Sequence, residues 1–141
     1  RITGVGSPRE AVDKAEVILT AGPILKEPRP VIEDDWLAPG SLGLPLDFDS
    51  YFCPSAFLKA DKFLTDDTPQ IKYYQTVGYF PTLPPIHGDL GELVSGQVKG
   101  RERADERIVC CNLGIAMDDM ATAILIYQKA KEKGLGTWLE L

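Results

Sequence analysis

The sequence predicts an α/β fold in which helices flank a parallel sheet. Short apolar stretches alternate with helical stretches, a pattern typical of βαβ units. The first strand candidate, residues 16–20, holds the uninterrupted apolar run Val17-Ile18-Leu19, as expected of a strand buried on both faces. The chain has 141 residues and is 44% hydrophobic, which fits one globular domain.

The chain opens with a capped helix that leads into the first strand. Ser7-Pro8-Arg9-Glu10 is a capping box, with serine as the N-cap, proline at the first helical position and glutamate three residues after the cap. The strand over residues 16–20 follows, and prolines at positions 23, 28 and 30 mark the loop after it.

The middle of the chain alternates between short strands and short helices. The expected elements are, in order, one helical turn or a short strand over residues 31–36, a strand over 41–46, a helix over 54–60, a strand over 62–65 and a helix over 68–77. Gly43 and Pro45 weaken the strand over 41–46, and Gly78 ends the last helix.

The second half begins with a proline-rich loop and ends in the longest helix. We expect a loop over 79–87, a short helix over 89–95, a charged loop over 96–105, a strand over 107–111 and a helix over about 115–133. The last helix closes on basic residues and Gly134, as the helix dipole and C-cap preferences require.

Composition excludes several classes of protein. With 15 Lys+Arg against 21 Asp+Glu, the net charge is −6, so we expect no nucleic-acid partner, because phosphates demand clustered basic residues. No apolar run approaches membrane-spanning length, and nothing at the start resembles a signal peptide, so we expect a soluble, cytoplasmic protein without a membrane partner. The chain begins with Arg1, which fits a piece of a longer protein.

The cysteines and the single histidine predict neither a disulfide framework nor a metal site. Three cysteines, two of them adjacent, cannot form an ordinary disulfide framework and indicate a reducing compartment, and we expect Cys110 and Cys111 to be buried. His87 is the only histidine and lies beside prolines, so we expect it at the surface; with no CxxC pair, the ligands of a zinc site are missing.

Acidic residues follow two of the predicted strands. Asp47 and Asp49 come directly after the strand over 41–46, where ligands gather in open α/β sheets and where burial beside aromatic residues would favour acid–base chemistry. Spacing alone does not separate the two, and a helix or turn cap at Asp49 explains the pattern equally well. Capping or a solvated helix face accounts for the pairs Asp66-Asp67 and Asp118-Asp119.

Two glycine-containing turns invite a nucleotide-binding interpretation. Gly4-Val5-Gly6 lacks both the preceding strand and the third glycine of a dinucleotide fingerprint, so we interpret it as a loop before the helix cap. Asn112-Leu113-Gly114 joins a strand to a helix and is either a tight turn or a contact to a ligand.

Several motifs in the same order resemble the ornithine cyclodeaminase/mu-crystallin family. They are Asp89-Leu-Gly-Glu-Leu-Val-Ser-Gly96, Gly100-Arg101, Cys111-Asn-Leu-Gly-Ile-Ala-Met-Asp-Asp119, the tail from Ala130 to Thr137, and upstream the stretches 15–20 and 36–40. The resemblance covers nearly the whole chain and implies a partial Rossmann-like sheet with a C-terminal helical segment.

The resemblance also implies a division of the chain. Residues 1–78 would be the second half of a Rossmann NAD(P)-binding domain, and residues 79–141 would complete that domain and return toward an N-terminal dimerisation domain. The glycine-rich phosphate turn, the ribose-binding acid and the substrate-binding arginine and lysine of the family lie upstream of this region. We therefore expect the chain alone to be inactive and the full-length protein to be a homodimer.

Carried over residue by residue, the resemblance assigns the acid/base role to Asp49, which would also contact the substrate, as would Leu113. The family's usual Gly-Gly or Gly-Ala before this aspartate is Asp47-Phe48 here. A lysine that contacts the cofactor in cyclodeaminases falls near Cys53. The remaining residues expected to line NAD or NADP are Thr20, Gly22, Gly43, Leu44, Pro45, Leu46 and Asn112.

The activity that the resemblance implies is hydride transfer from an amino acid to NAD(P)⁺, which gives an imine. Ornithine would be converted to proline and ammonia, or a related amino acid dehydrogenase or ketimine reductase reaction would occur. The alternative, a non-catalytic crystallin-like ligand-binding or assembly module, has precedents in the same family.

Overall fold

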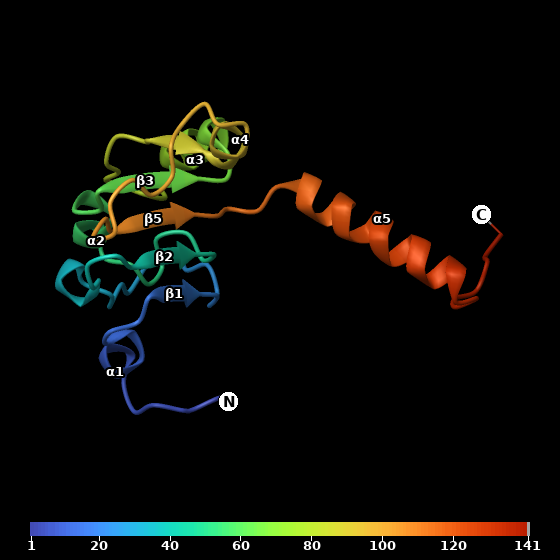
Figure 1. Cartoon of the computed structure of the whole chain (residues 1–141), viewed down its shortest axis with the longest axis horizontal. Helices are drawn as coiled ribbons and strands as arrows, with labels where there is room; N and C mark the ends of the chain where they lie inside the picture. Colours follow the sequence, from blue (N-terminus) through green and yellow to red (C-terminus); the bar gives the residue numbers. More distant parts are fainter. Residues whose placement is uncertain (141) are drawn as a thin grey trace.

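The structure, a computed structural model that describes residues 1–140, contains a single parallel sheet with short helices around it (Figure 1). The strands are β1 (Val17–Thr20), β2 (Leu42–Pro45), β3 (Lys62–Thr65), β4 (Gly88–Asp89) and β5 (Ile108–Cys111). The helices are α1 (Pro8–Val12), α2 (Pro54–Leu58), α3 (Thr68–Thr76), α4 (Leu90–Val94) and α5 (Ala116–Glu132), with a 3₁₀ turn at Asp34–Trp36.

The strand order is β1-β2-β5-β3-β4, and every neighbouring pair is parallel. The predicted α/β fold with a parallel sheet is therefore confirmed. Strand β5 comes last in the chain but lies between β2 and β3 in the sheet. Since all the strands run in the same direction, the carboxyl ends of strands from distant parts of the sequence meet at one edge of the sheet (Figure 1).

One face of the sheet carries the larger part of the hydrophobic core. Ile18, Phe63 and Val109 point from three strands into a cluster formed with α1, α2, α3 and the connecting loops. The cluster members that are at most 1% exposed are Val109, Phe52, Ala56, Phe57, Ile71, Phe80 and Cys111. The aromatic side chains of α2 and of the loops thus fill the space above the middle of the sheet.

The opposite face is covered over only part of its width. Leu64, Ile108 and Cys110 are buried beneath α4, but Val17 and Leu19 of β1 are 58% and 57% exposed. The prediction that residues 16–20 form a strand buried on both faces is wrong on this side. The reason is that α4 packs at the β3 end of the sheet, and no helix among residues 1–140 covers β1 here.

Local capping explains where several helices begin. The Ser7 hydroxyl accepts a hydrogen bond from the Glu10 backbone N–H at 3.2 Å, as the capping-box pattern predicts. The Asp67 carboxylate accepts one from Gln70 N at 2.6 Å at the start of α3. Asp89 and Glu92 form a reciprocal capping box on α4, which was not predicted.

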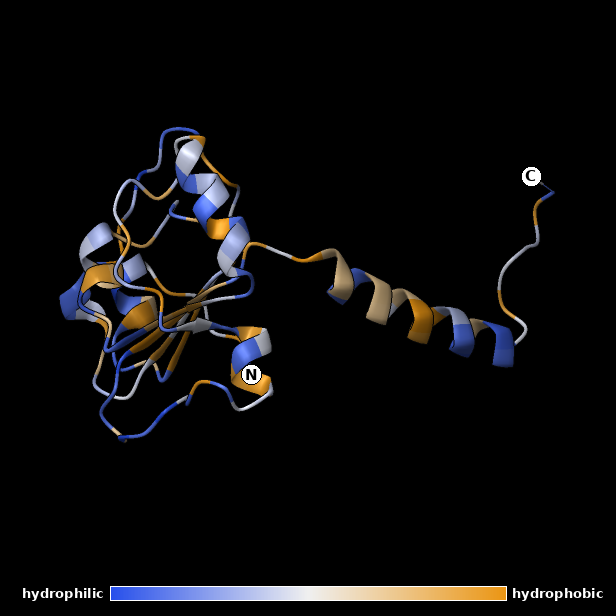
Figure 2. Cartoon of the chain, turned by 90° about the horizontal axis from the view of Figure 1, so that it is seen from above, coloured by the Kyte–Doolittle hydropathy of each residue, from blue (hydrophilic) through white to orange (hydrophobic). Residues whose placement is uncertain are grey.

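Helix α5 stands clear of the sheet in both views (Figures 1 and 2). Its bounds, Ala116–Glu132, lie close to the predicted 115–133. Met120, Ile124 and Tyr127 lie along one side of this helix and are 59%, 51% and 55% exposed, and none of them belongs to either core cluster.

The exposed side of α5 predicts self-association of the 141-residue chain, because contiguous apolar surface of this kind associates in water. We expect sedimentation equilibrium to give an average mass that rises with concentration above 15.5 kDa. Replacing Met120, Ile124 and Tyr127 together by glutamine should move the average toward the monomer mass. A monomeric wild-type chain at all concentrations would contradict this expectation.

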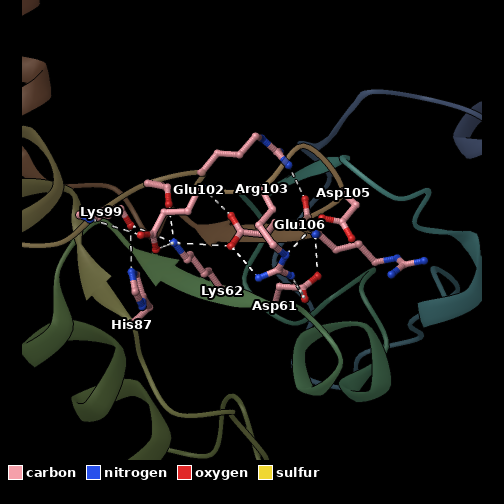
Figure 3. A network of polar contacts seen from close by, with 11 residues as sticks. Asp61, Lys62, His87, Lys99, Glu102, Arg103, Asp105 and Glu106 are labelled. Carbon is pink, nitrogen blue, oxygen red and sulfur yellow. Dashed lines mark hydrogen bonds and ion pairs between the residues drawn. The ribbon is translucent and has the colours of Figure 1, made fainter.

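A charged network holds the loop over residues 96–107 against the amino ends of β3 and β5 (Figure 3). The ammonium group of Lys62, a residue only 8% exposed, donates to the Gly100 carbonyl at 2.5 Å and to Glu102 Oε2 at 2.7 Å. Arg103 bridges Glu106 Oε1 at 3.3 Å and Asp61 Oδ1 at 3.2 Å. The network lies at the edge of the sheet opposite to the carboxyl ends of the strands.

The acidic members of this network predict how stability depends on pH. The hydrogen bond from Lys62 lowers the pKa of Glu102, and the backbone N–H of Glu102 lowers the pKa of Glu106. Carboxyl groups with a lowered pKa in the folded state contribute stability above their ordinary pKa, and this contribution is lost as the pH falls through the folded-state values. We therefore expect the urea concentration at the unfolding midpoint to decrease as the pH is lowered below 5. In Lys62→Met this decrease should be less steep. Parallel pH profiles of the two proteins would contradict the role of Lys62.

Candidate active site

The candidate site lies at the carboxyl ends of β1, β2 and β5, which are neighbours in the sheet. Thr20 is the last residue of β1, Asp47 and Asp49 follow β2, and Asn112 follows β5. In open parallel sheets this edge is where ligands bind. The structure thus brings together side chains that are up to 92 positions apart in the sequence, from position 20 to position 112.

Asp47 is fully buried and makes hydrogen bonds through both carboxylate oxygens. Oδ1 accepts from the Thr20 hydroxyl at 2.8 Å, and Oδ2 accepts from the Gly22 backbone N–H at 2.9 Å. The carboxylate therefore ties the end of β1 to the end of β2. A Cβ atom on Gly22 would lie 2.4 Å from the tip of the Tyr51 ring, so a larger residue at this position would require the ring to move.

Phe48 separates the two aspartates in a left-handed backbone conformation, with φ of +60°. This conformation is strained for a residue other than glycine, and packing compensates for the strain. The buried ring lies 4.7 Å from Tyr74, 5.1 Å from Tyr79 and 5.7 Å from Phe80, measured between centroids. The positive φ gives a physical reason for the glycine that the family resemblance allows at this position, and Phe48 holds the same conformation through its aromatic contacts.

Asp49 differs from Asp47 because one of its oxygens has no partner. Oδ2 accepts a hydrogen bond from the Phe80 backbone N–H at 2.7 Å. The residue is only 8% exposed, and its Oδ1 is buried without a hydrogen-bond partner among the described residues. A buried acceptor without a donor costs about 1–3 kcal/mol, which makes this oxygen the natural place for a ligand donor.

The Asp49 side chain lines a cavity of about 260 Å³ whose other walls are mostly apolar. Phe52, Phe57 and Phe80 form one part of the wall, and the prolines at positions 28, 30, 54 and 81 form another. The hydrogen bond from the Phe80 N–H to Asp49 was not predicted, because a backbone N–H leaves no signal in the sequence. The sequence offers one hint, Gly78, which follows α3 and lets the chain turn back.

The turn after β5 is held from both sides. The Gly114 N–H donates to Asp66 Oδ2 at 2.6 Å, and the Gly114 carbonyl accepts from Gln70 Nε2 at 3.0 Å. With φ of +89°, this position favours glycine. Asp67 is the cap expected of the Asp66-Asp67 pair, whereas the role of Asp66 and of Gln70 in fixing this turn was missed.

Asn112 and Leu113 lie directly before this turn and are both half-buried. The Asn112 N–H donates to the Pro45 carbonyl at 3.0 Å, so it continues the pairing of β5 with β2. Its side-chain amide donates to the Cys110 carbonyl at 3.0 Å. Leu113 packs against the main core. Their predicted contacts, to the cofactor and to the substrate respectively, remain predictions.

The other predicted cofactor residues run along β2. Leu46 is exposed at the carboxyl edge, and Pro45 and Leu44 lie just before it. Gly43 lies deeper in the strand, where a Cβ atom would come within 2.9 Å of Phe52 and 3.3 Å of Val109. Close packing against the core thus accounts for this glycine, and its contact with a cofactor remains a prediction, as do those of the other three residues.

Several other candidates lie away from this edge. His87 is exposed, with Nε2 2.9 Å from the Lys99 carbonyl oxygen, and the glycines of the Gly4-Val5-Gly6 segment are exposed before α1. Asp118 and Asp119 are exposed in the first turn of α5. Their positions agree with surface and capping roles.

The cysteines offer no reactive thiolate. Cys53, Cys110 and Cys111 are all buried and unpaired, as expected for Cys110 and Cys111. Burial raises the pKa of Cys53 and of Cys110 to about 11, and raises that of Cys111 as well. Since the thiolate is the nucleophile, covalent catalysis by these groups is disfavoured at neutral pH.

A larger cavity, of about 680 Å³, lies between α3 and the segment from Leu83 to Asp89. Its acidic side chains, Asp89 and Glu92, are engaged in the capping box of α4. The unsatisfied carboxylate oxygen of Asp49, rather than cavity size, therefore identifies the candidate site.

Within residues 1–140, no cluster of three potential metal ligands occurs, and no helix has the length and apolar character needed to cross a membrane.

The relatives found by comparison with known proteins include two amino acid dehydrogenases. The chain is 34% identical over 140 residues to N-((2S)-2-amino-2-carboxyethyl)-L-glutamate dehydrogenase of Staphylococcus aureus, covering 94% of this chain and 40% of that protein. It is 25% identical over 138 residues to alanine dehydrogenase of Archaeoglobus fulgidus, covering 92% of this chain and 42% of that protein. The chain thus spans about two fifths of the length of these relatives.

A solved structure with the same arrangement is that of Δ¹-pyrroline-2-carboxylate reductase of Thermococcus litoralis, in complex with NADH and L-proline. It matches with a TM-score of 0.76 and 28% identity, covering 96% of this chain and 44% of that one. The family model of the ornithine cyclodeaminase/mu-crystallin family matches residues 1–134. The chain therefore belongs to the ornithine cyclodeaminase/mu-crystallin family.

Proposed function

We propose that this chain forms the nicotinamide end of the active site in an NAD(P)-dependent enzyme that oxidises an amino acid to an imine, or runs the reverse reaction. The observation that carries the proposal is the buried, unpartnered Oδ1 of Asp49 at the carboxyl edge of the sheet. The names of the relatives support the general reaction, since they include amino acid dehydrogenases and an imine-acid reductase.

The residues present fit the redox end of such a cofactor. Asp49 offers a desolvated acceptor, and Thr20 and Asn112 lie half-buried on the flanking strand ends. No glycine-rich phosphate turn follows a strand within residues 1–140. We therefore include in the proposal that the groups that bind the pyrophosphate and the ribose lie outside these residues. In this proposal residues 1–78 are the second half of the Rossmann domain, and residues 79–141 complete it and return toward a dimerisation domain.

The proposed role of Asp49 is to hold and move the proton of the amine. When bound, the nicotinamide ring accepts a hydride from the α-carbon of the substrate. In the oxidative direction, Oδ1 accepts one proton from the α-ammonium group, and the nitrogen lone pair released forms the C=N bond as the hydride leaves. The Phe80 N–H keeps Oδ2 in place, so that the free oxygen stays directed at the amine.

The residues around Asp49 indicate a class of substrate rather than a single compound. The mostly apolar wall around Asp49 favours a small amino acid or a cyclic imino acid, and Leu113 adds a further apolar contact. We propose two kinds of specific reaction. One is the conversion of ornithine to proline and ammonia, and the other is a dehydrogenase or ketimine reductase reaction on a related amino acid. The full-length enzyme is proposed to act as a homodimer in the cytoplasm.

A substrate screen on the full-length protein tests the proposal. The protein is incubated with NAD⁺ or NADP⁺ and single amino acids, and with NADH or NADPH and cyclic imino acids, while nicotinamide absorbance at a reduced-cofactor wavelength is followed. We expect turnover with at least one pair and none with the 141-residue chain alone. Cofactor binding without any turnover would instead support a non-catalytic binding role.

A further inference from the structure

The hydrogen bonds of Asp47 determine what the Thr20 hydroxyl can offer to a ligand. Asp47 is 0% exposed, and its hydrogen-bond partners are the Thr20 hydroxyl and the Gly22 N–H. Among residues 1–140 no basic side chain forms an ion pair with it. In both hydrogen bonds the Asp47 carboxylate is the acceptor, and the Thr20 hydroxyl has a single hydrogen to donate. The hydroxyl hydrogen of Thr20 is therefore committed to Asp47, and Thr20 has only oxygen lone pairs left for another partner.

Thr20 is in a position to use those lone pairs. It is the last residue of β1 and only half-buried, whereas Asp47 is inaccessible. A ligand at this edge would meet an acceptor that the carboxylate behind it polarises, because hydrogen bonds in a chain strengthen one another. The complementary ligand group is an N–H donor.

We infer that Asp47 is a positioning residue that presents the Thr20 hydroxyl as an acceptor to the carboxamide N–H₂ of the nicotinamide. The inference rests on the proposed function, in which Asp49, two residues further along, stands beside the reacting ring. The carboxamide is the hydrogen-bond donor of that ring. The buried aspartate, which stands where the family resemblance expects glycine, thus acquires a role in cofactor orientation.

Asp47→Asn reverses the polarity with little change of shape. The asparagine oxygen can accept from the Gly22 N–H, but its N–H₂ group must then donate to Thr20. This donation occupies the hydroxyl oxygen and turns the hydroxyl hydrogen toward the ligand, where it opposes the carboxamide donor. We expect the Kd of NADH, measured by equilibrium titration of the full-length protein without substrate, to rise about tenfold.

A cofactor analogue makes the test specific. The reduced 3-acetylpyridine analogue of NADH has a methyl ketone in place of the carboxamide and cannot donate. The wild-type protein should bind this analogue about three- to tenfold more weakly than NADH, and Asp47→Asn should bind both with similar Kd values. Thr20→Val should lose the discrimination in the same way, and Thr20→Ser should keep it.

The matched control is Asp67→Asn, an equally conservative change at the cap of α3, which should leave the ratio of the two Kd values unchanged. If Asp47→Asn does not fold, the Thr20 variants carry the test. Wild-type discrimination retained in Asp47→Asn or in Thr20→Val overturns the inference while NADH binding upholds the proposed function. Absence of NADH and NADPH binding by the wild-type protein overturns both.

Discussion

Replacing Asp49 by asparagine in the full-length protein is expected to lower kcat/KM by about 10²–10⁴-fold, the usual contribution of a general acid or base. The amide oxygen can still accept from the Phe80 N–H, so the local structure is retained. What is lost is the carboxylate oxygen to which we assign the proposed proton transfer. Steady-state kinetics with the best substrate found in the screen measures the effect, and the Kd of NADH should change little.

The control for this substitution is Asp105→Asn, since Asp105 is exposed and lies at the opposite edge of the sheet (Figure 3). It should leave kcat/KM unchanged. Turnover of Asp49→Asn within twofold of the wild type would show that the proton is handled elsewhere and that the unpartnered oxygen has another purpose.

Phe57→Ala is expected to cause the largest loss of stability, about 3–5 kcal/mol in the free energy of unfolding. Phe57 is 1% exposed and packs with three other aromatic rings. Its centroid lies 5.7 Å from that of Phe63, 5.9 Å from that of Phe52 and 6.3 Å from that of Phe80. Truncation leaves a cavity that these rigid rings cannot close. Urea unfolding followed by circular dichroism measures the change.

The neighbouring residue provides a matched control. Leu58 follows Phe57 in α2 but is 49% exposed, so Leu58→Ala should cost less than about 1.5 kcal/mol. Both substitutions introduce alanine into the same helix, so the difference between them reports burial rather than helix propensity. Repeating the titrations at two protein concentrations separates unfolding from self-association. Equal losses in the two variants would contradict the assigned core.

Sequence patterns predicted most of the elements because strands in a parallel sheet leave a strong local signal. The strand over 62–65 has the predicted bounds, and α5 differs from its prediction by one residue at each end. The segment 31–36 combines both alternatives left open for it, since Ile32 forms a single parallel bridge with Phe52 and residues 34–36 form a 3₁₀ turn. Strand β4 was missed because two residues carry no periodicity.

The parts that could not be predicted depend on distant residues. Burial of β1 is decided by what covers its outer face, and Val17 and Leu19 are exposed although their sequence is that of a buried strand. Asp47 and Asp49 look alike locally. They differ because the partners of Asp47 are 25 and 27 positions away, and that of Asp49 is 31 positions away. Only the folded chain shows which carboxylate keeps a free oxygen.

The hydrogen bonds that hold the turn at Gly114 restrict where α5 can change its direction relative to the sheet. Because Asp66 and Gln70 hold both polar groups of this glycine, a change in helix direction has to be absorbed at Ile115, whose extended backbone carries no side-chain cap. A helix of 17 residues is about 25 Å long, so a swing of roughly 10° at that point displaces its far end by about 4 Å. Small adjustments where the strand tips meet are thereby amplified at the far end of α5.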